Sequence, residues 1–218
     1  MRTRPTAADA ERRRWSEDRT AIRRALELAF DVGPEGSVTW LTVEGSTDEA
    51  ASHRIHGIEL PFEDGSFDRL VCAEGFQLLA DRGRALEEMH RVLVRGGEIE
   101  VAVPGSIEGN PPFAEFAASL ERRSGARGAA AIRWLFCMPE PDDLRGALVA
   151  GAFEDVRIDV VRTTARSPSI ETFLARSGFF DRQTTAELAH LLRALESRAD
   201  EHGLRLGTET IVGHARRV

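Results

Sequence analysis

The stretch LPFEDGSFDRLVCAEGFQLLADRGRALEEMHRVLVRGG, residues 60–97, decides the fold of this chain. It predicts four features in order, namely an acidic turn, a buried strand, a helix and a glycine stop, at residues 63–66, 69–73, 81–94 and 96–97. A second apolar strand is expected directly afterwards, over residues 98–103. A helix that joins two apolar strands is typical of a βαβ crossover, which builds a parallel sheet with helices on its faces.

The same stretch resembles the second half of class I S-adenosylmethionine-dependent methyltransferases of the small-molecule type. The resemblance rests on LPFEDGSFD at 60–68, on the strand that follows, and on RVLVRGG at 91–97. It implies a three-layer Rossmann-like α/β sandwich with a mostly parallel sheet. The family has seven strands, and the short N-terminal part of this chain lowers the expectation to about five or six.

The N-terminal part predicts one helix and one strand. A helix is expected from Ser16, because Ile22, Leu26 and Phe30 recur at helical spacing. After a turn, the β-branched run SVTWLTV predicts a strand over 37–43.

The resemblance implies that this strand leads into a cofactor loop of the form D-x-G-x-G-x-G. Glycine is required there because a Cβ would strike the ligand or forbid the turn. Trp40 takes the place of the acid, Thr42, Glu44 and Ser46 take the places of the glycines, and Gly45 lies off register. Glu44 also places a carboxylate where the carboxylate of the cofactor should lie, and like charges repel.

The family then has two helices and two further strands, of which the second strand ends in an acid that binds the ribose. Here only the thirteen residues 47–59 precede Leu60, too few for those elements. His56 stands nearest to the position of an aspartate that binds adenine in the family. These departures predict that ordinary binding of S-adenosylmethionine is lost.

Candidate functional residues follow the strand at 69–73. Ala73, Glu74 and Gln77 come at its carboxyl end, the edge where open α/β sheets bind ligands. The resemblance implies that this turn approaches the sulfonium of the cofactor and the substrate, so Glu74 and Gln77 are the candidate catalytic residues. An alternative is that Gln77 caps the next helix and Glu74 is solvated. The pair His53 and His56 has no cysteine or carboxylate at ligand spacing, so no metal site is predicted.

The rest of the chain predicts alternating helices and strands. Helices are expected over 112–123, 140–151, 169–176 and 184–201, an apolar run over 129–138, and strands over 156–161 and 206–216. The whole chain, 1–218, is expected to form one domain with a flexible lead-in at 1–15 and helical cap or insert regions at 106–150 and 165–203.

Composition limits the partners. The formal net charge of -7 argues against a nucleic-acid partner held through phosphates. The two cysteines are too few for a disulfide framework and suit a reducing compartment. Since no apolar run has the length of a membrane span or of a signal peptide, a cytoplasmic protein without a membrane partner is predicted.

Two functions follow from these observations. The first is a methyltransferase-like protein that has lost the usual cofactor site and acts as a non-catalytic, ligand-binding or regulatory homologue. The second is an active S-adenosylmethionine-dependent methyltransferase for a small, partly apolar metabolite. Whether the chain is an enzyme stays open. In addition, the shortened sheet should expose the edge of the strand at 37–43, which predicts a homodimer or a hetero-partner at that edge.

Overall fold

The computed structural model describes residues 25–32, 38–45, 51–56, 59–167, 199–200 and 203–218. These residues form two compact units. The sheet unit contains the described residues within 15–105, 137–160 and 210–218, and the helical unit contains those within 106–136 and 161–209. The expected cap region 106–150 is therefore divided between the two units.

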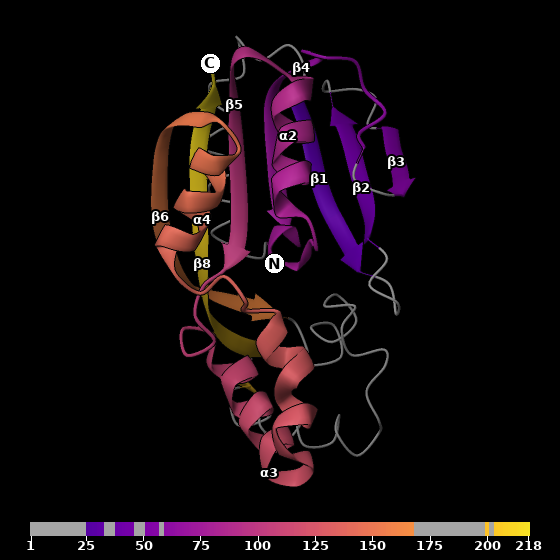
Figure 1. Cartoon of the computed structure of the whole chain (residues 1–218). Helices are drawn as coiled ribbons and strands as arrows, with labels where there is room; N and C mark the ends of the chain where they lie inside the picture. The colour runs from indigo at the N-terminus through magenta and orange to yellow at the C-terminus, as the bar shows by residue number, and fades with distance from the viewer. Residues whose placement is uncertain (1–24, 33–37, 46–50, 57–58, 168–198, 201–202) are drawn as a thin grey trace. The chain divides into compact units, whose positions relative to one another are not determined.

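The described strands form an eight-stranded sheet (Figure 1). Strand residues 161–167, 199–200 and 203–209 belong to the helical unit, and all other strand residues belong to the sheet unit. Its order is β3-β2-β1-β4-β5-β8-β6, and β7 pairs with β8. The strands span Ala25–Val32 (β1), Val38–Gly45 (β2), Ala51–His56 (β3), Phe67–Glu74 (β4), Leu93–Pro104 (β5), Phe153–Ser167 (β6), Ala199–Asp200 (β7) and Gly203–Arg217 (β8). The predicted α/β class is confirmed, and the sheet has more strands than the five or six expected.

Strand direction differs from the expectation of a mostly parallel sheet. β1, β4 and β5 are parallel, whereas β2 is antiparallel to β1, β3 to β2, and β8 to β5. The cause is the length of the connections, because only residues 33–37 join β1 to β2 and only residues 46–50 join β2 to β3. A parallel pair needs a crossover of a dozen residues or more, while a few residues suffice for an antiparallel pair.

The predicted helix from Ser16 through Phe30 is wrong over its described part, since Ala25–Val32 is strand β1. Leu26 and Leu28 are both fully buried, which is the period-two pattern of a strand. Residues four apart, such as Leu26 and Phe30, share one face of a helix and also one face of a strand. Pairing with β4 on one side and β2 on the other decides the outcome.

The prediction that the strand at 37–43 has an exposed edge is also wrong. The strand at 37–43 is β2, and it is hydrogen-bonded to β1 on one side and to β3 on the other. No free edge therefore remains on β2.

Two helices of the sheet unit cover one face of the sheet (Figure 1): α2, Arg82–Val92, and α4, Pro141–Ala150. Asp81 caps α2, with its side chain accepting a hydrogen bond from the Arg84 amide at 2.9 Å. α4 begins with a capping box formed by Glu140 and Asp143. Their apolar faces join the strands in one core, whose members include Leu70, Cys72, Met89, Ile99, Leu144 and Leu148. The helices predicted at 81–94 and 140–151 are thus confirmed.

The helical unit holds α3, Pro111–Trp134, which is interrupted by Gly125 at φ 69°. A second, separate core contains Phe116, Ile132 and Leu206. The helix predicted at 112–123 is confirmed within α3. The strands predicted at 156–161 and 206–216 lie in β6 and β8. The helix predicted at 169–176 lies outside the described residues. Of the helix predicted at 184–201, only residues 199–200 are described, and they form strand β7.

The acidic turn at 63–66 is held by Arg91 of α2. Its guanidinium donates to the carbonyl oxygens of Phe62 at 2.7 Å and Leu60 at 2.9 Å, and to the carboxylates of Asp64 and Glu88, both at 2.8 Å. Glu88 also accepts the amide of Leu60 at 2.9 Å. The hydrogen bond from Arg91 is the main cause that lowers the pKa of Glu88. We call these residues the Arg91 network. It holds residues 60–64 against α2.

Candidate functional site

The carboxyl ends of the parallel strands β1, β4 and β5 lie along one edge of the sheet, which we call the ligand edge. The chain leaves β1 toward β2 and β3 on one side, and leaves β4 toward β5 on the other. The gap between β1 and β4 is therefore the point where the strand order reverses. Open α/β sheets bind ligands outside the carboxyl ends at such a point.

The candidate catalytic residues lie at the end of β4 and in the turn that follows it. Ala73 and Glu74 end β4, where Glu74 is in register with Ala29 of β1. Gly75 then adopts φ 90°, a left-handed conformation that favours glycine, and the 3-10 helix η1, Phe76–Leu78, follows. The structure thus brings Ala73, Glu74 and Gln77 to the ligand edge, as the sequence predicted.

Gln77 is buried, with 5% of its surface exposed. Its carbonyl oxygen accepts a hydrogen bond from the Arg82 guanidinium at 2.7 Å and one from the Cys137 thiol at 3.1 Å. The start of α2 and residue 137 therefore both hold the turn after β4 in place. Gln77 lies within the core rather than at the helix cap that was the alternative, since that cap is made by Asp81.

The predicted cofactor residues of the first loop do not lie in a loop. Trp40, Thr42, Glu44 and Gly45 belong to β2. By register, Trp40 is opposite Phe30, Thr42 opposite Leu28, Glu44 opposite Leu26 and Gly45 opposite Ala25. Glu44 and Gly45 therefore lie at the beginning of β1, away from the ligand edge. The assignment of β2 as the strand that leads into the cofactor loop is wrong, because β1 is the strand beside β4.

His56, the last residue of β3, does reach the ligand edge. It is paired with Thr39, which in turn is paired with Asp31 near the end of β1. The structure thus brings His56 to the same edge as Glu74, although two strands lie between β3 and β4.

Sequence reasoning missed Asp31. It precedes the carboxyl end of β1, and the sequence continues as Asp31-Val-Gly33-Pro-Glu-Gly36. The available signal was an acid near the end of an apolar segment, followed by two glycines. It was overlooked because residues 16–32 were interpreted as a helix. Residues 33–37 lie outside the described part of the chain.

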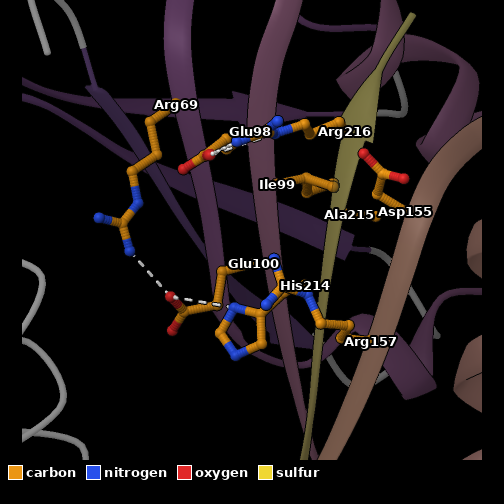
Figure 2. A pocket seen from close by; sticks show the side chains of 9 residues that line it. All are labelled: Arg69, Glu98, Ile99, Glu100, Asp155, Arg157, His214, Ala215 and Arg216. Carbon is orange, nitrogen blue, oxygen red and sulfur yellow. Dashed lines mark hydrogen bonds and ion pairs between the residues drawn. The ribbon is translucent and has the colours of Figure 1, made fainter. Parts of the chain in front are cut away.

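A pocket lies on the sheet face formed by β4, β5, β6 and β8 (Figure 2). Arg69 pairs with Glu100 at 2.9 Å, and Arg216 pairs with Glu98 at 2.9 Å. The His214 Nδ1 atom lies 4.0 Å from Glu100. Opposite charges on adjacent strands stabilise a sheet, and the pocket contains none of the predicted site residues. We therefore interpret it as a charge ladder of the sheet.

The resemblance to the methyltransferase family also implies that the apolar run 129–138 roofs a substrate cavity, with core packing as the alternative. Phe136 belongs to the core of the helical unit, Met138 to the core of the sheet unit, and Trp134 is 46% exposed. Of the cysteines, Cys72 is buried, and burial raises the pKa of its thiol, whereas Cys137 is exposed. Among the described residues, no group of histidine, cysteine and acidic side chains has the arrangement of a metal site.

Comparison with known proteins gives a methyltransferase domain as the family that matches residues 35–101. Demethylmenaquinone methyltransferase of Staphylococcus epidermidis is 28% identical over 153 residues, which cover 60% of this chain and 63% of that protein. The enzyme of the same name from Listeria welshimeri is 36% identical over 88 residues, which cover 34% of this chain and 37% of that protein. The chain thus spans less than two thirds of the length of these relatives.

Among solved structures, a candidate methyltransferase of Bacillus halodurans is 17% identical, with a TM-score of 0.44 and coverage of 73% of both chains. Within the described part of the chain, every helix is too short or too polar to cross a membrane.

Proposed function

We propose that this chain is a binding or regulatory member of the class I S-adenosylmethionine-dependent methyltransferase family and that its usual cofactor site is degraded. The match of residues 35–101 to a methyltransferase domain supports the family. One observation carries the proposal, namely that β2 runs antiparallel to β1 and follows it after only residues 33–37. In the family, a helix and a parallel second strand follow the first strand, and both contribute to the cofactor site.

The missing helix removes one source of affinity. Residues 33–37 cannot hold a helix of normal length between β1 and β2. A helix N-terminus attracts a carboxylate such as that of the methionine part of the cofactor, and this attraction contributes about 0.3–2 kcal/mol.

The reversed strand removes a second source. The ribose-binding acid of the family ends the second strand at the ligand edge, but here β2 ends at Gly45, opposite Ala25 at the beginning of β1. Losing a hydrogen bond to a charged group costs about 1.5–3 kcal/mol. The two losses together amount to about 2–5 kcal/mol, which weakens binding by about 30- to 5,000-fold.

Calorimetric titration tests this proposal. For a site of about micromolar affinity, a loss of about 1,000-fold or more, toward the upper end of this range, leaves a dissociation constant of about 1 mM or weaker, which we expect for both S-adenosylmethionine and S-adenosylhomocysteine. Circular dichroism of the same sample controls for folding. Binding of either compound in the micromolar range to the folded protein would end the proposal.

The second candidate function is an active methyltransferase for a small, partly apolar metabolite. Two observations favour it: the half of the fold from β4 through α2 to β5 is complete, and Asp31, Gly33 and Gly36 follow β1 in the sequence. Such enzymes act largely by holding the methyl donor and acceptor in line, with one polar group to orient the acceptor. Glu74 and Gln77 are the residues proposed for that role.

Substitutions in the turn after β4 distinguish the two functions. If the protein is active, Glu74→Ala and Gln77→Ala should each lower turnover by about 100-fold or more, within the usual range for a lost acid–base or orienting group. Glu87→Ala, on the exposed face of α2, is the matched control and should keep full turnover. Methyl transfer from labelled S-adenosylmethionine is the measurement. Under the first function the wild-type protein transfers no label to any acceptor.

The proposal includes a small-molecule ligand at the ligand edge and a homodimer or hetero-partner through a surface other than β2. Light scattering at a protein concentration of about tens of micromolar tests the homodimer, because a dimer with an association free energy of about 8 kcal/mol or more is populated there. The free thiols of Cys72 and Cys137 support a cytoplasmic location.

A further inference from the structure

A buried carboxylate lies where the helical unit meets its chain connections. Glu209 of β8 is 6% exposed. One oxygen, Oε1, accepts hydrogen bonds from the Ser106 amide and the Ser106 hydroxyl, both at 3.0 Å. The other oxygen, Oε2, accepts one from the Arg162 guanidinium at 2.7 Å. The carboxylate of Glu209 thus joins residue 106 to residue 162 of the chain.

Asn110 joins the same cluster through the backbone of Glu209. Its side-chain amide donates to the Glu209 carbonyl at 3.1 Å and to the Ser106 carbonyl at 2.9 Å, and its side-chain oxygen accepts the Glu209 amide at 3.2 Å. The Gly109 amide donates to the Ser106 hydroxyl at 3.0 Å. A Cβ on Gly109 would lie 2.6 Å from the Glu209 carboxylate, which shows how closely the segment packs on it.

The position of these residues in the chain gives the cluster its significance. Within the described residues, the chain passes between the two units four times, after Gly105, Phe136, Val160 and Glu209. Ser106 directly follows the first of these points, while Arg162 and Glu209 lie at two points that fall within the continuous strands β6 and β8. One carboxylate therefore ties together segments that are up to 103 residues apart in sequence.

The charge of Glu209 is favoured by its partners. Burial acts to raise the pKa of this carboxyl, but the hydrogen bonds from the Ser106 amide, from Arg162 and from the Ser106 hydroxyl outweigh it and lower the pKa below its ordinary value. Hydrogen bonds to an ionised acceptor are about twice as strong as those between neutral groups. The network thus depends on the charge of one side chain.

We infer that Ser106, Asn110, Arg162 and Glu209 form a clasp that holds residues 106–110 to β8 and to the part of β6 around Arg162, and that loss of the Glu209 charge opens it. Opening frees residues 106–110 and loosens β6 around Arg162, while the sheet unit stays folded. The clasp is a conformational device and is independent of which ligand the protein binds.

Hydrogen exchange of the whole chain tests the clasp with the variant Glu209→Gln, which keeps the shape and removes the charge. We expect exchange of the peptide covering residues 105–110 to rise about tenfold or more, because the Ser106 amide then donates to a neutral acceptor in place of a charged one and the segment opens more often. Peptides from α2 should keep their rates. Trypsin should also cut after Arg162 several-fold faster, since proteolysis follows local opening.

Two further variants complete the test. Arg162→Ala removes a side chain that is 78% exposed and leaves no cavity, and should raise the same exchange rates to a smaller extent. Glu121→Gln breaks the exposed pair with Arg133 in the same unit and should change nothing. The inference is overturned if Glu209→Gln and Arg162→Ala leave residues 105–110 as protected as in the wild type. It is equally overturned if Glu209→Gln accelerates exchange in α2 to the same degree, because the effect would then be general unfolding.

Discussion

Replacing Arg91 by alanine should lower the free energy of unfolding by about 3 kcal/mol or more, the range for breaking a largely buried ion pair by removing one partner. Arg91 donates to two backbone carbonyls and two carboxylates, and the Glu88 side chain is 9% exposed. Without Arg91, the buried Glu88 carboxylate keeps the hydrogen bond from the Leu60 amide but loses both hydrogen bonds from the guanidinium. Urea unfolding followed by circular dichroism measures the loss.

The pH dependence separates this network from general packing. The pKa of Glu88 is lowered from 4.5 in the folded protein, mainly by its hydrogen bond from Arg91. A lowered pKa contributes stability that is present above pH 4.5 and is lost as the pH falls through the folded value. The difference between wild type and Arg91→Ala should therefore shrink below pH 4.5. Arg84→Ala, which breaks an exposed pair with Glu87, should cost under about 0.5 kcal/mol. A difference that is constant with pH would contradict the ion-pair explanation.

The substitution Phe67→Ala should cost about 3–5 kcal/mol, the usual loss for a deleted core aromatic ring. Phe67 is fully buried at the beginning of β4 and stacks edge-on with Phe62, with ring centroids 5.0 Å apart. It therefore joins the turn of LPFEDGSFD to the core beneath α2. Phe67→Leu is the control and should cost about 1.5 kcal/mol or less, because it keeps most of the volume. Equal losses for the two variants would mean that the ring itself contributes nothing.

The part of the fold from residue 60 to residue 104 could be predicted because its signals are local. Asp81 caps α2, and the apolar runs of β4 and β5 flank the helix. The glycine stop expected at 96–97 is wrong in its place, since both glycines lie within β5, which begins at Leu93. β1 could not be predicted in this way. Its apolar residues fit both a helix and a strand, and only pairing with β4, some forty residues away, decides between them.

The residues of the candidate site that could be predicted are likewise those on strands with local signals. The position of Glu74 and Gln77 at the carboxyl end of β4 could be predicted because that strand was recognised, and their role in a site stays a prediction. Asp31 was missed because its strand was not recognised, and the residues of β2 were assigned to a loop in consequence. The Glu209 clasp was outside the reach of sequence patterns, since Ser106 and Glu209 are 103 residues apart.

The direction of β2 links these findings to function. A family member with a parallel second strand presents the carboxyl ends of its first two strands to the cofactor. Here the register places Val38, the first residue of β2, opposite Val32, the last residue of β1. The ligand edge next to β1 is thus formed by the beginning of β2, and the side of the site that should bind the ribose has no acid from the end of that strand.

The most direct test of the account is a crystal structure of the protein grown with millimolar S-adenosylhomocysteine. The account predicts that no adenosyl group is seen at the carboxyl ends of β1 and β4, beside Val32 and Glu74. An adenosyl group bound there, with its ribose hydroxyls held by an acidic side chain, would contradict it.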